Sequence, residues 1–286
     1  MNIEEKLLLK RETIEAALDR LLPLGDTLLT QAMRYAVLSG GKRFRSLLAL
    51  SSGECFGISQ GVVLPFASAV ELIHNYSLIH DDLPMMDNDD FRRGKLSCHK
   101  AYREDIALLA GDGLLTLAFE VLASAPVENE YSMRKECLIL EIAQSAGIDG
   151  MVGGQLLDIT LTPDNLSEEL LLDLMARKTG ALILGAVKVG PILAGASPPE
   201  FQALLDYGQN IGMAFQMRDD ILDLPETSSQ DSSLRPNAAS YFGVEEANTR
   251  LQNHVQSAIK ALDRVSLESE ELRFLASRLL DLNRER

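Results

Sequence analysis

The segment HDDLPMMDNDDFRRGK, residues 80–95, places five aspartates directly before a group of basic residues. Carboxylates this close repel one another unless a cation is bound, and oxygen ligands of this kind suit Mg²⁺, which retains waters and shares phosphate oxygens. The arginines that follow, Arg92 and Arg93, suit bidentate contacts to phosphate. The segment is therefore either a metal site beside an anion site or a solvated surface loop.

The convergence of these aspartates depends on Pro84. In an unbroken helix Asp87 would lie about 120° from Asp81 and about 140° from Asp82, so the three could not share one face. Proline lacks an N–H and crowds the preceding turn of a helix. We therefore expect the helix to kink or end near Leu83 and the chain to bring Asp87 back toward Asp81.

A second acidic segment, FQMRDDILD, occupies residues 215–223. On a helix Asp219 and Asp223 fall about 40° apart, and Asp220 lies within about 60° of Asp223. An Asp pair at a helix end is more commonly a cap or a solvated face. Two such segments in one chain, each ending an apolar helix, favour metal binding.

The segment GGKRFR, residues 40–45, is a candidate anion site. Its glycines and a helix N-terminus offer backbone N–H groups to an anion. Lys42, Arg43 and Arg45 oppose the helix macrodipole, so the arrangement is costly unless an anion is present. A solvated turn is the alternative interpretation.

Several other polar residues interrupt apolar helical stretches. Lys178 and Thr179 lie within MARKTGALI, where a lysine that reaches the surface is the common alternative to a functional one. His74 is either a satisfied core histidine or a ligand. Gln155 and Asp158 share one helix face, which is more often simply a polar face.

Helical periodicity dominates the remaining sequence, and no Val-, Ile- or Thr-rich alternating run is found. We predict an all-α chain without a domain boundary, so that residues 1–286 form a single domain. The long, polar, Ser-rich stretch 224–240 is predicted to be a functional loop. The predicted helices span residues 3–22, 26–39, 42–55, 61–82, 102–124, 132–146, 150–160, 167–177, 179–195, 199–222, 244–263 and 268–283.

The composition narrows the possible partners. A net charge of −15 disfavours nucleic acid and anionic membranes as partners, so an anionic substrate would need metal or a local basic cluster. Three cysteines without metal spacing indicate reduced thiols and a cytoplasmic location. The apolar run 180–196 is interrupted by Lys188 and Pro191, so we interpret it as a buried helix pair and not as a membrane span.

Taken together, the motifs resemble the bacterial farnesyl diphosphate synthase (geranyltranstransferase) family of trans-isoprenyl diphosphate synthases. The resemblance covers nearly the whole chain and rests on motifs in the family's order: GGKRFR, ELIHNYSLIHDDLPMMDNDDFRRGK, CHKAY, LLAGDGLL, GMVGGQLLD, RKTGALI and FQMRDDILD. The pattern DDxxxxD followed by RRG is highly specific, whereas DDxxD is weaker alone. The resemblance implies an isoprenoid synthase-type bundle of roughly ten or more helices around a central cavity, present as a homodimer.

The resemblance also implies roles for individual residues. It implies three Mg²⁺ ions with substrate bound, or Mn²⁺ in their place, held by Asp81, Asp82, Asp87, Asp219 and Asp223, with Asp89 and Asp90 outside the metal site. The resemblance implies that Arg92 and Lys178 contact the diphosphate of the allylic substrate (dimethylallyl or geranyl diphosphate). It implies that isopentenyl diphosphate is bound by Lys42, Arg45, His74 and Arg93. It also implies that Thr179 and Gln216 face the reacting centre.

Product length and the active-site lid are two further expectations. Tyr76, with Ser77 beside it, lies about one helical turn before Asp81 and is similar to an aromatic floor that stops growth at C15, farnesyl diphosphate. The family's lid lysine is missing, because no lysine occurs between residues 224 and 243, and Arg235 is expected to replace it. Ser46 and Arg218 stand where the family usually has Pro and Gln.

Four alternatives stay open on sequence alone. The chain could make geranylgeranyl diphosphate, or it could be a partner subunit of low activity, given its altered lid. A class I terpene cyclase shares the first motif, but the segments GGKRFR and DDILD disfavour it. A structural helical protein with solvated acids is the last alternative.

Overall fold

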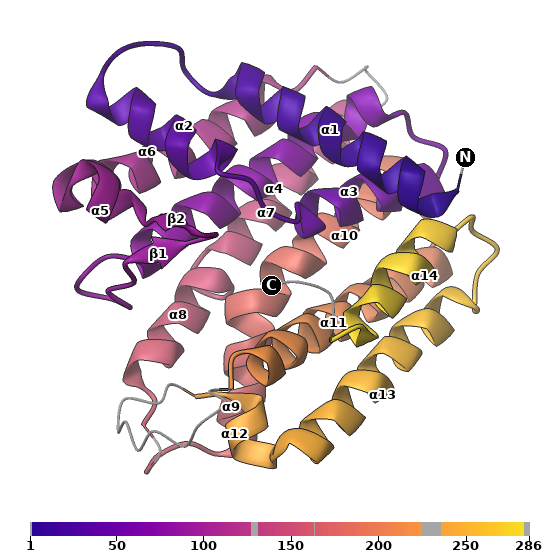
Figure 1. Cartoon of the computed structure of the whole chain (residues 1–286). Helices are drawn as coiled ribbons and strands as arrows, with labels where there is room; N and C mark the ends of the chain where they lie inside the picture. The colour runs from indigo at the N-terminus through magenta and orange to yellow at the C-terminus, as the bar shows by residue number, and fades with distance from the viewer. Residues whose placement is uncertain (1, 127–130, 163, 225–235, 283–286) are drawn as a thin grey trace.

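The computed structural model describes residues 2–126, 131–162, 164–224 and 236–282, and nearly all of its regular structure is helical (Figure 1). The predicted all-α class is confirmed. The elements are α1 (Ile3–Leu21), α2 (Leu28–Leu38), α3 (Phe44–Cys55), α4 (Gln60–Asp81), β1 (Phe91–Arg92), β2 (Lys95–Leu96), α5 (Cys98–Tyr102), α6 (Glu104–Ser124), α7 (Ser132–Ala146), α8 (Met151–Thr160), α9 (Glu168–Met175), α10 (Ala181–Ala194), α11 (Pro198–Leu222), α12 (Ala238–Phe242), α13 (Val244–Leu262) and α14 (Glu270–Ser277).

The core is built on α4, α10 and α11. Helix α4 packs against α3 and α6, α10 packs against α3, α7 and α11, and α11 packs against α13 (Figure 1). Side chains such as Phe66 and Ile73 on α4 and Tyr207 on α11 are fully buried. Since α4 and α11 each end in an acidic segment, the core packing fixes where both segments lie.

The chain breaks at Pro84 in the way the spacing predicts. Helix α4 ends at Asp81, and the Asp87 N–H donates to the Asp81 carbonyl at 2.8 Å. The Asn88 N–H donates to the Leu83 carbonyl at 3.1 Å, which closes the turn. Asp87 therefore returns to the end of α4, and this prediction is confirmed.

A short hairpin follows this turn and was not predicted. Strands β1 and β2 pair antiparallel through Phe91–Leu96 and Arg92–Lys95. The two residues between them, Arg93 and Gly94, both have positive φ, at 54° and 74°. Such φ values belong to tight two-residue hairpin loops, in which an arginine is unusual. The short helices α5 and α12 were also missed, because five residues carry too little periodicity.

The interpretation of residues 180–196 as a helix pair is wrong, whereas the single helix predicted over residues 179–195 is confirmed. The segment is one helix, α10, which a π-helical turn at Ala176–Gly180 joins to α9. Pro191 cannot donate to the Val187 carbonyl four residues earlier. The Ser52 hydroxyl donates to that carbonyl instead, at 2.5 Å, so the helix continues through the proline.

Two helices, α4 and α6, are long and apolar enough to cross a membrane by composition. A buried core helix of a soluble protein passes the same test. In α4, 67% of the apolar window is buried inside the protein, against 39% in α6. These two helices are therefore weak grounds for a membrane span.

A buried ion cluster ties the N-terminal helix to the rest of the fold. Lys10 of α1, only 3% exposed, donates to the carboxylates of Glu54 and Glu271, which belong to α3 and α14. The Ser51 hydroxyl donates to the same Glu271 oxygen at 2.6 Å. Removing one partner of a buried pair leaves the other charge uncompensated, which is far more costly than losing a surface pair.

We expect Lys10→Met to lower the free energy of unfolding by about 3 kcal/mol, because Glu271 stays buried without its cation. Urea denaturation followed by circular dichroism measures the change. Arg11→Met, at an exposed neighbouring position, is the matched control and should change stability by no more than about 0.5 kcal/mol. Equal effects of the two substitutions would contradict this account.

Candidate active site

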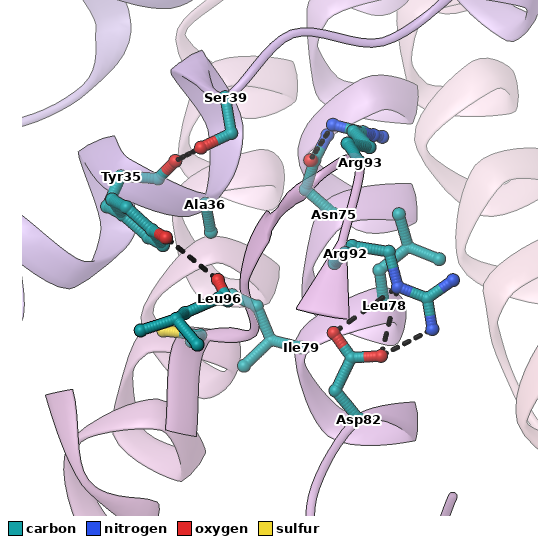
Figure 2. Close-up of a pocket in the computed structure, with 11 residues that line it drawn as sticks. Tyr35, Ala36, Ser39, Asn75, Leu78, Ile79, Asp82, Arg92, Arg93 and Leu96 are labelled. Atoms are coloured by element: carbon teal, nitrogen blue, oxygen red, sulfur yellow. Dashed lines mark hydrogen bonds and ion pairs between the residues drawn. The ribbon is translucent and has the colours of Figure 1, made fainter. Parts of the chain in front are cut away.

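The first acidic segment places Asp82 in an ion pair. Asp82 is 2% exposed, and its carboxylate accepts from Nε of Arg92 at 3.0 Å and from the same guanidinium's Nη2 (Figure 2). Burial raises the pKa of Asp82, and the Arg92 contact offsets part of that rise. Asp89 contacts Arg92 at 3.2 Å, and Asp90 pairs with Lys100 at 2.8 Å. The acids of this segment are thus not equivalent.

Asp81 lies in a different electrostatic environment. Burial raises the pKa of its carboxyl group to about 6; the charge of Lys178 opposes the rise, and the charge of Asp87 adds to it. The desolvated carboxylate is poorly stabilised by its protein neighbours. Its chemistry fits a site that a cation completes.

The second acidic segment, at the end of α11, divides its three acids in the same way. Burial raises the pKa of Asp219 to about 6, partly offset by Arg218 and Lys42. Asp220 is only 6% exposed and accepts from the Ala238 N–H and the Gln216 side-chain amide, both at 2.6 Å. Asp223 is exposed and caps the helix. Burial also raises the pKa of Asp220 to about 6, and its two hydrogen bonds offset only part of that rise. Asp219 and Asp223 remain the candidates for a cation, because Asp220 is occupied by protein donors.

An ion pair links the two acidic helix ends. Lys178 donates to Asp158 of α8 at 2.5 Å. Asp158 raises the pKa of both Asp81 and Asp220, so it lies near both segments. Gly154 allows α8 to approach the backbone at Lys178, because a Cβ there would lie 2.1 Å from the backbone nitrogen of Lys178. The sequence favoured an ordinary polar position for Asp158. Its ion pair with Lys178, 20 residues away, is what places it between the acidic segments.

Thr179 and Gln216 form a hydrogen-bonded chain. The Thr179 hydroxyl donates to the side-chain carbonyl of Gln216, whose amide N–H donates to Asp220 at 2.6 Å. Because an ionised Asp220 only accepts, it orients the Gln216 amide toward itself and leaves the carbonyl for Thr179. The two residues predicted to share one site thus contact one another.

The predicted anion-binding residues lie along the start of α3, on α4 and in the hairpin. Lys42 is exposed, whereas Arg45 is 7% exposed and lies 5.6 Å from the centre of the Phe215 ring. Within the described residues, Nε of Arg45 has no hydrogen-bond partner. Burial, together with the charges of Arg45 and Arg93, holds the pKa of His74 well below its usual value. A neutral imidazole thus lies among cations that an anion would satisfy.

The pocket in Figure 2 lies between α2, α4 and the hairpin. Asp82, Arg92 and Arg93 line it, but no residue of α11 does, so it adjoins one acidic segment only. In the described part of the chain, no group of three or more His, Cys, Asp or Glu side chains is close enough to hold a metal ion. All-carboxylate ligands spread over two helix ends fit a hard cation whose remaining ligands come from water and substrate.

Tyr76 is buried below the first acidic segment. Its ring meets the His80 ring edge-on at 5.7 Å, and Nε2 of His80 donates to the Leu108 carbonyl of α6 at 3.0 Å. Gly111 leaves room for the imidazole, since a Cβ there would lie 2.1 Å from Nε2. Ser77 donates to its own helix at the His74 carbonyl. Tyr76 is therefore braced by α6 through His80.

One predicted residue falls outside the described structure, and another lies inside the protein. Arg235 lies outside the described residues. Arg43 was grouped with Lys42 and Arg45 as anion-binding, but it is 1% exposed and pairs with Glu15 and Glu71 inside the protein. Asn75, which no motif had singled out, accepts from Arg93 at 3.4 Å.

Comparison with known proteins places these features in one family. The chain matches the polyprenyl synthetase family over residues 26–233. It is 38% identical to farnesyl diphosphate synthase of Escherichia coli (strain K12), over 92% of each chain, and 40% identical to geranylgeranyl diphosphate synthase of Cyanophora paradoxa, over 87% of this chain and 86% of the relative.

A solved apo structure agrees. An FPP/GFPP synthase from Zymomonas mobilis superposes with a TM-score of 0.88 at 34% identity, over 98% of this chain and 99% of the other. The likeness extends over nearly the whole chain. The chain belongs to the polyprenyl synthetase family and is a prenyltransferase that elongates isoprenoid chains.

Proposed function

We propose that this prenyltransferase condenses isopentenyl diphosphate with dimethylallyl or geranyl diphosphate and releases farnesyl diphosphate, a C15 product. The observation that carries the proposal is the pair of buried acidic helix ends linked through Lys178 and Asp158, with the Tyr76 ring about one turn below the first. Similarity to the farnesyl diphosphate synthase of Escherichia coli supports it.

The family uses divalent metal to bind substrate diphosphates. We infer that Asp81, Asp82, Asp87, Asp219 and Asp223 hold Mg²⁺, with three ions when substrate is bound, and that Mn²⁺ can replace it. Bound metal would neutralise negative charge that grows on the departing diphosphate. The raised pKa values of Asp81 and Asp219, about 6 for each, support a site made for a cation.

The two diphosphates would be bound by different cations of the protein. Arg92 and Lys178, next to Asp82 and Asp158, would contact the allylic diphosphate. A second group would contact isopentenyl diphosphate, and it comprises Lys42, Arg45, His74 and Arg93. The buried Nε of Arg45, which has no partner within the described residues, supports this second site.

The reaction then needs the protein to stabilise charge and exclude water. Cleavage of the allylic C–O bond leaves a carbocation, which the double bond of isopentenyl diphosphate attacks before a proton is lost to the diphosphate. Thr179 and Gln216, oriented by Asp220, would direct oxygen lone pairs toward the cation. Apolar walls would prevent water from capturing it.

Geranylgeranyl diphosphate is the second candidate product. The 40% identity to a geranylgeranyl diphosphate synthase favours it. The buried Tyr76 favours C15, because an aromatic ring below the metal site shortens the space for a growing chain. Tyr76 therefore separates the two candidates.

We further propose that residues 1–286 form one domain, that two copies form a homodimer and that the protein is cytoplasmic. Exposed leucines on α6, Leu108 and Leu109, support a subunit contact. The cysteines of the described chain, Cys55, Cys98 and Cys137, are all free thiols, which supports a reducing compartment.

The direct test incubates the protein with Mg²⁺, isopentenyl diphosphate and geranyl diphosphate and identifies the products by chromatography. Farnesyl diphosphate as the main product supports the proposal, and its loss with a chelator supports the metal requirement. A main product of C20 would favour the second candidate, and no prenyl product would contradict both.

Asp81→Asn and Asp219→Asn should each lower kcat on the order of 10²–10³-fold, because each removes a charge that binds metal at the leaving group. Steady-state assays with saturating substrates measure the loss. Asp90→Asn is the matched control, because Asp90 is exposed and its carboxylate pairs with Lys100 at the surface. It should leave kcat within about twofold of wild type.

Acid should weaken metal binding. Asp81 and Asp219, with pKa values of about 6, are ionised above that pH and protonated below it, so a cation must displace their protons at low pH. The rise in melting temperature produced by Mg²⁺ with inorganic pyrophosphate should therefore be large at about pH 7.5 and small at about pH 5. A rise of the same size at both values would contradict this assignment.

Tyr76→Ala should lengthen the product to C20 or beyond, because it removes the ring that His80 braces. Chromatography of the products from isopentenyl and geranyl diphosphate measures chain length. Tyr102→Ala, which removes a ring packed edge-on against Tyr35 of α2 and not against His80, is the control and should leave C15 as the main product. An unchanged product from Tyr76→Ala would remove this ring from the account.

A further inference from the structure

Arg43 lies between two residues of the proposed isopentenyl diphosphate site, yet it faces the protein interior. Its side chain is fully buried, whereas Lys42 before it is exposed. Arg43 caps the start of α3 with a φ of 52°, in the left-handed region that arginine rarely adopts. Such a conformation persists only where the surroundings hold it.

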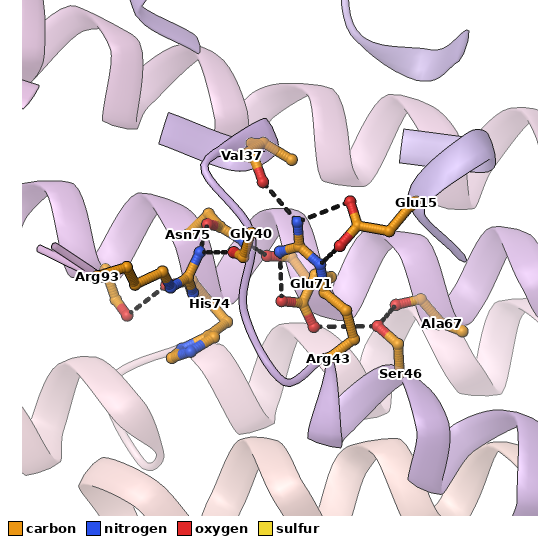
Figure 3. Close-up of polar contacts among 11 residues, drawn as sticks. Glu15, Val37, Gly40, Arg43, Ser46, Ala67, Glu71, His74, Asn75 and Arg93 are labelled. Carbon is orange, nitrogen blue, oxygen red and sulfur yellow. Dashed lines mark hydrogen bonds and ion pairs between the residues drawn. The ribbon is translucent and has the colours of Figure 1, made fainter. Parts of the chain in front are cut away.

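Figure 3 shows what holds it. Nε and Nη2 of Arg43 donate to the two carboxylate oxygens of Glu15, at 2.8 and 3.0 Å. Nη1 donates to Glu71 at 3.0 Å, and Nη2 also donates to the Val37 carbonyl at 2.6 Å. The guanidinium thus joins α1, the end of α2 and α4 to the start of α3. Its charge is matched inside the protein and is not available to a phosphate.

Glu71 is the centre of this network. It is 1% exposed, and one carboxylate oxygen accepts from Arg43 while the other accepts from the Ser46 hydroxyl at 3.1 Å. The single hydroxyl proton of Ser46, where the family usually has proline, is shared between this oxygen and the Ala67 carbonyl at 2.9 Å. A buried carboxylate is tolerated only when its oxygens are satisfied in this way.

Arg43 ends the loop 39–43, which connects α2 to α3, and Arg93 holds the opposite side of this loop. One turn after Glu71, the Asn75 amide donates to the Glu71 carbonyl at 2.8 Å and its oxygen accepts from Arg93. Arg93 also donates to the Gly40 carbonyl (Figure 3). Gly41 permits the contact, because a Cβ there would lie 2.9 Å from Cζ of Arg93. Helix α4 therefore holds the loop 39–43 through two arginines, one on each side.

We propose that Arg43, through its pair with Glu71, is a positioning residue that sets Lys42, Arg45 and Arg93 for isopentenyl diphosphate. This inference rests on the proposed function of those three residues. Without Arg43, the left-handed start of α3 is no longer enforced, so Lys42 and Arg45 lose their shared geometry. The uncompensated Glu71 would also attract Arg93 away from substrate, since Arg93 contacts Asn75, one helical turn after Glu71.

The test compares the two substrates. Arg43→Lys keeps the charge but cannot donate to Glu15, Glu71 and Val37 together. It should raise the KM for isopentenyl diphosphate about tenfold and change the KM for geranyl diphosphate and kcat less than about twofold, because a binding contact of one substrate is weakened. Equal KM changes for both substrates, or none, would overturn the proposal.

A second variant separates positioning from stability. In Arg43→Met/Glu71→Leu an apolar pair replaces the buried charges, which commonly restores stability. The proposal expects a melting temperature close to wild type together with a KM for isopentenyl diphosphate that stays high. A wild-type KM in this variant would show that the pair is only structural.

Lys10→Met is the matched control, because it breaks a buried ion cluster of similar kind that contacts neither acidic segment nor the loop 39–43. It should lower stability but leave both KM values within about twofold of wild type. The outcome also separates this inference from the proposed function. An inactive wild type would contradict the function, whereas an active wild type with an unaltered Arg43→Lys variant would contradict only the role of Arg43.

Discussion

Burial of carboxylates away from water is the constraint around which this site is built. Helices α4 and α11 bring acidic ends into the protein, where burial raises the pKa of Asp81 and of Asp219 to about 6. At each helix end one acid also has partners within the protein: Asp82 accepts from Arg92, and Asp220 accepts from Ala238 and Gln216. Lys178 pairs with Asp158, whose charge acts on both Asp81 and Asp220. A bound cation would offset the carboxylate charge at both ends in the proposed function.

Contacts within the protein also divide the basic residues of the proposed substrate site. Arg43 and Arg93 both have a positive φ; Arg43 belongs to the loop that carries Lys42, and Arg93 donates to the Gly40 carbonyl of that loop. The charge of Arg43 is matched by Glu15 and Glu71, whereas Arg93 remains exposed. Residues of one type, close in sequence or space, thus divide into groups that support the fold and groups proposed to bind substrate. The division follows from the buried Glu71 of α4, with which Arg43 pairs.

The sequence predicted local features well and distant partners poorly. The spacing of Asp81 and Asp87 around Pro84 predicted a helix break, which the structure confirms, because proline geometry is a local property. The helix pair at 180–196 was wrong, because the Ser52 hydroxyl, over 100 residues away, satisfies the carbonyl freed by Pro191. Asp158 and Arg43 were misjudged for the same reason: Lys178, Glu15 and Glu71 are distant in sequence.

The central claim is that acids from both helix ends bind metal ions shared with one diphosphate. A crystal structure of the protein with Mg²⁺ and inorganic pyrophosphate tests it most directly. The account predicts metal ions that bridge the pyrophosphate to Asp81 on one side and to Asp219 on the other, with Arg92 or Lys178 in contact with the phosphate oxygens. Pyrophosphate bound without metal at Asp219, or metal bound by neither helix end, would contradict it.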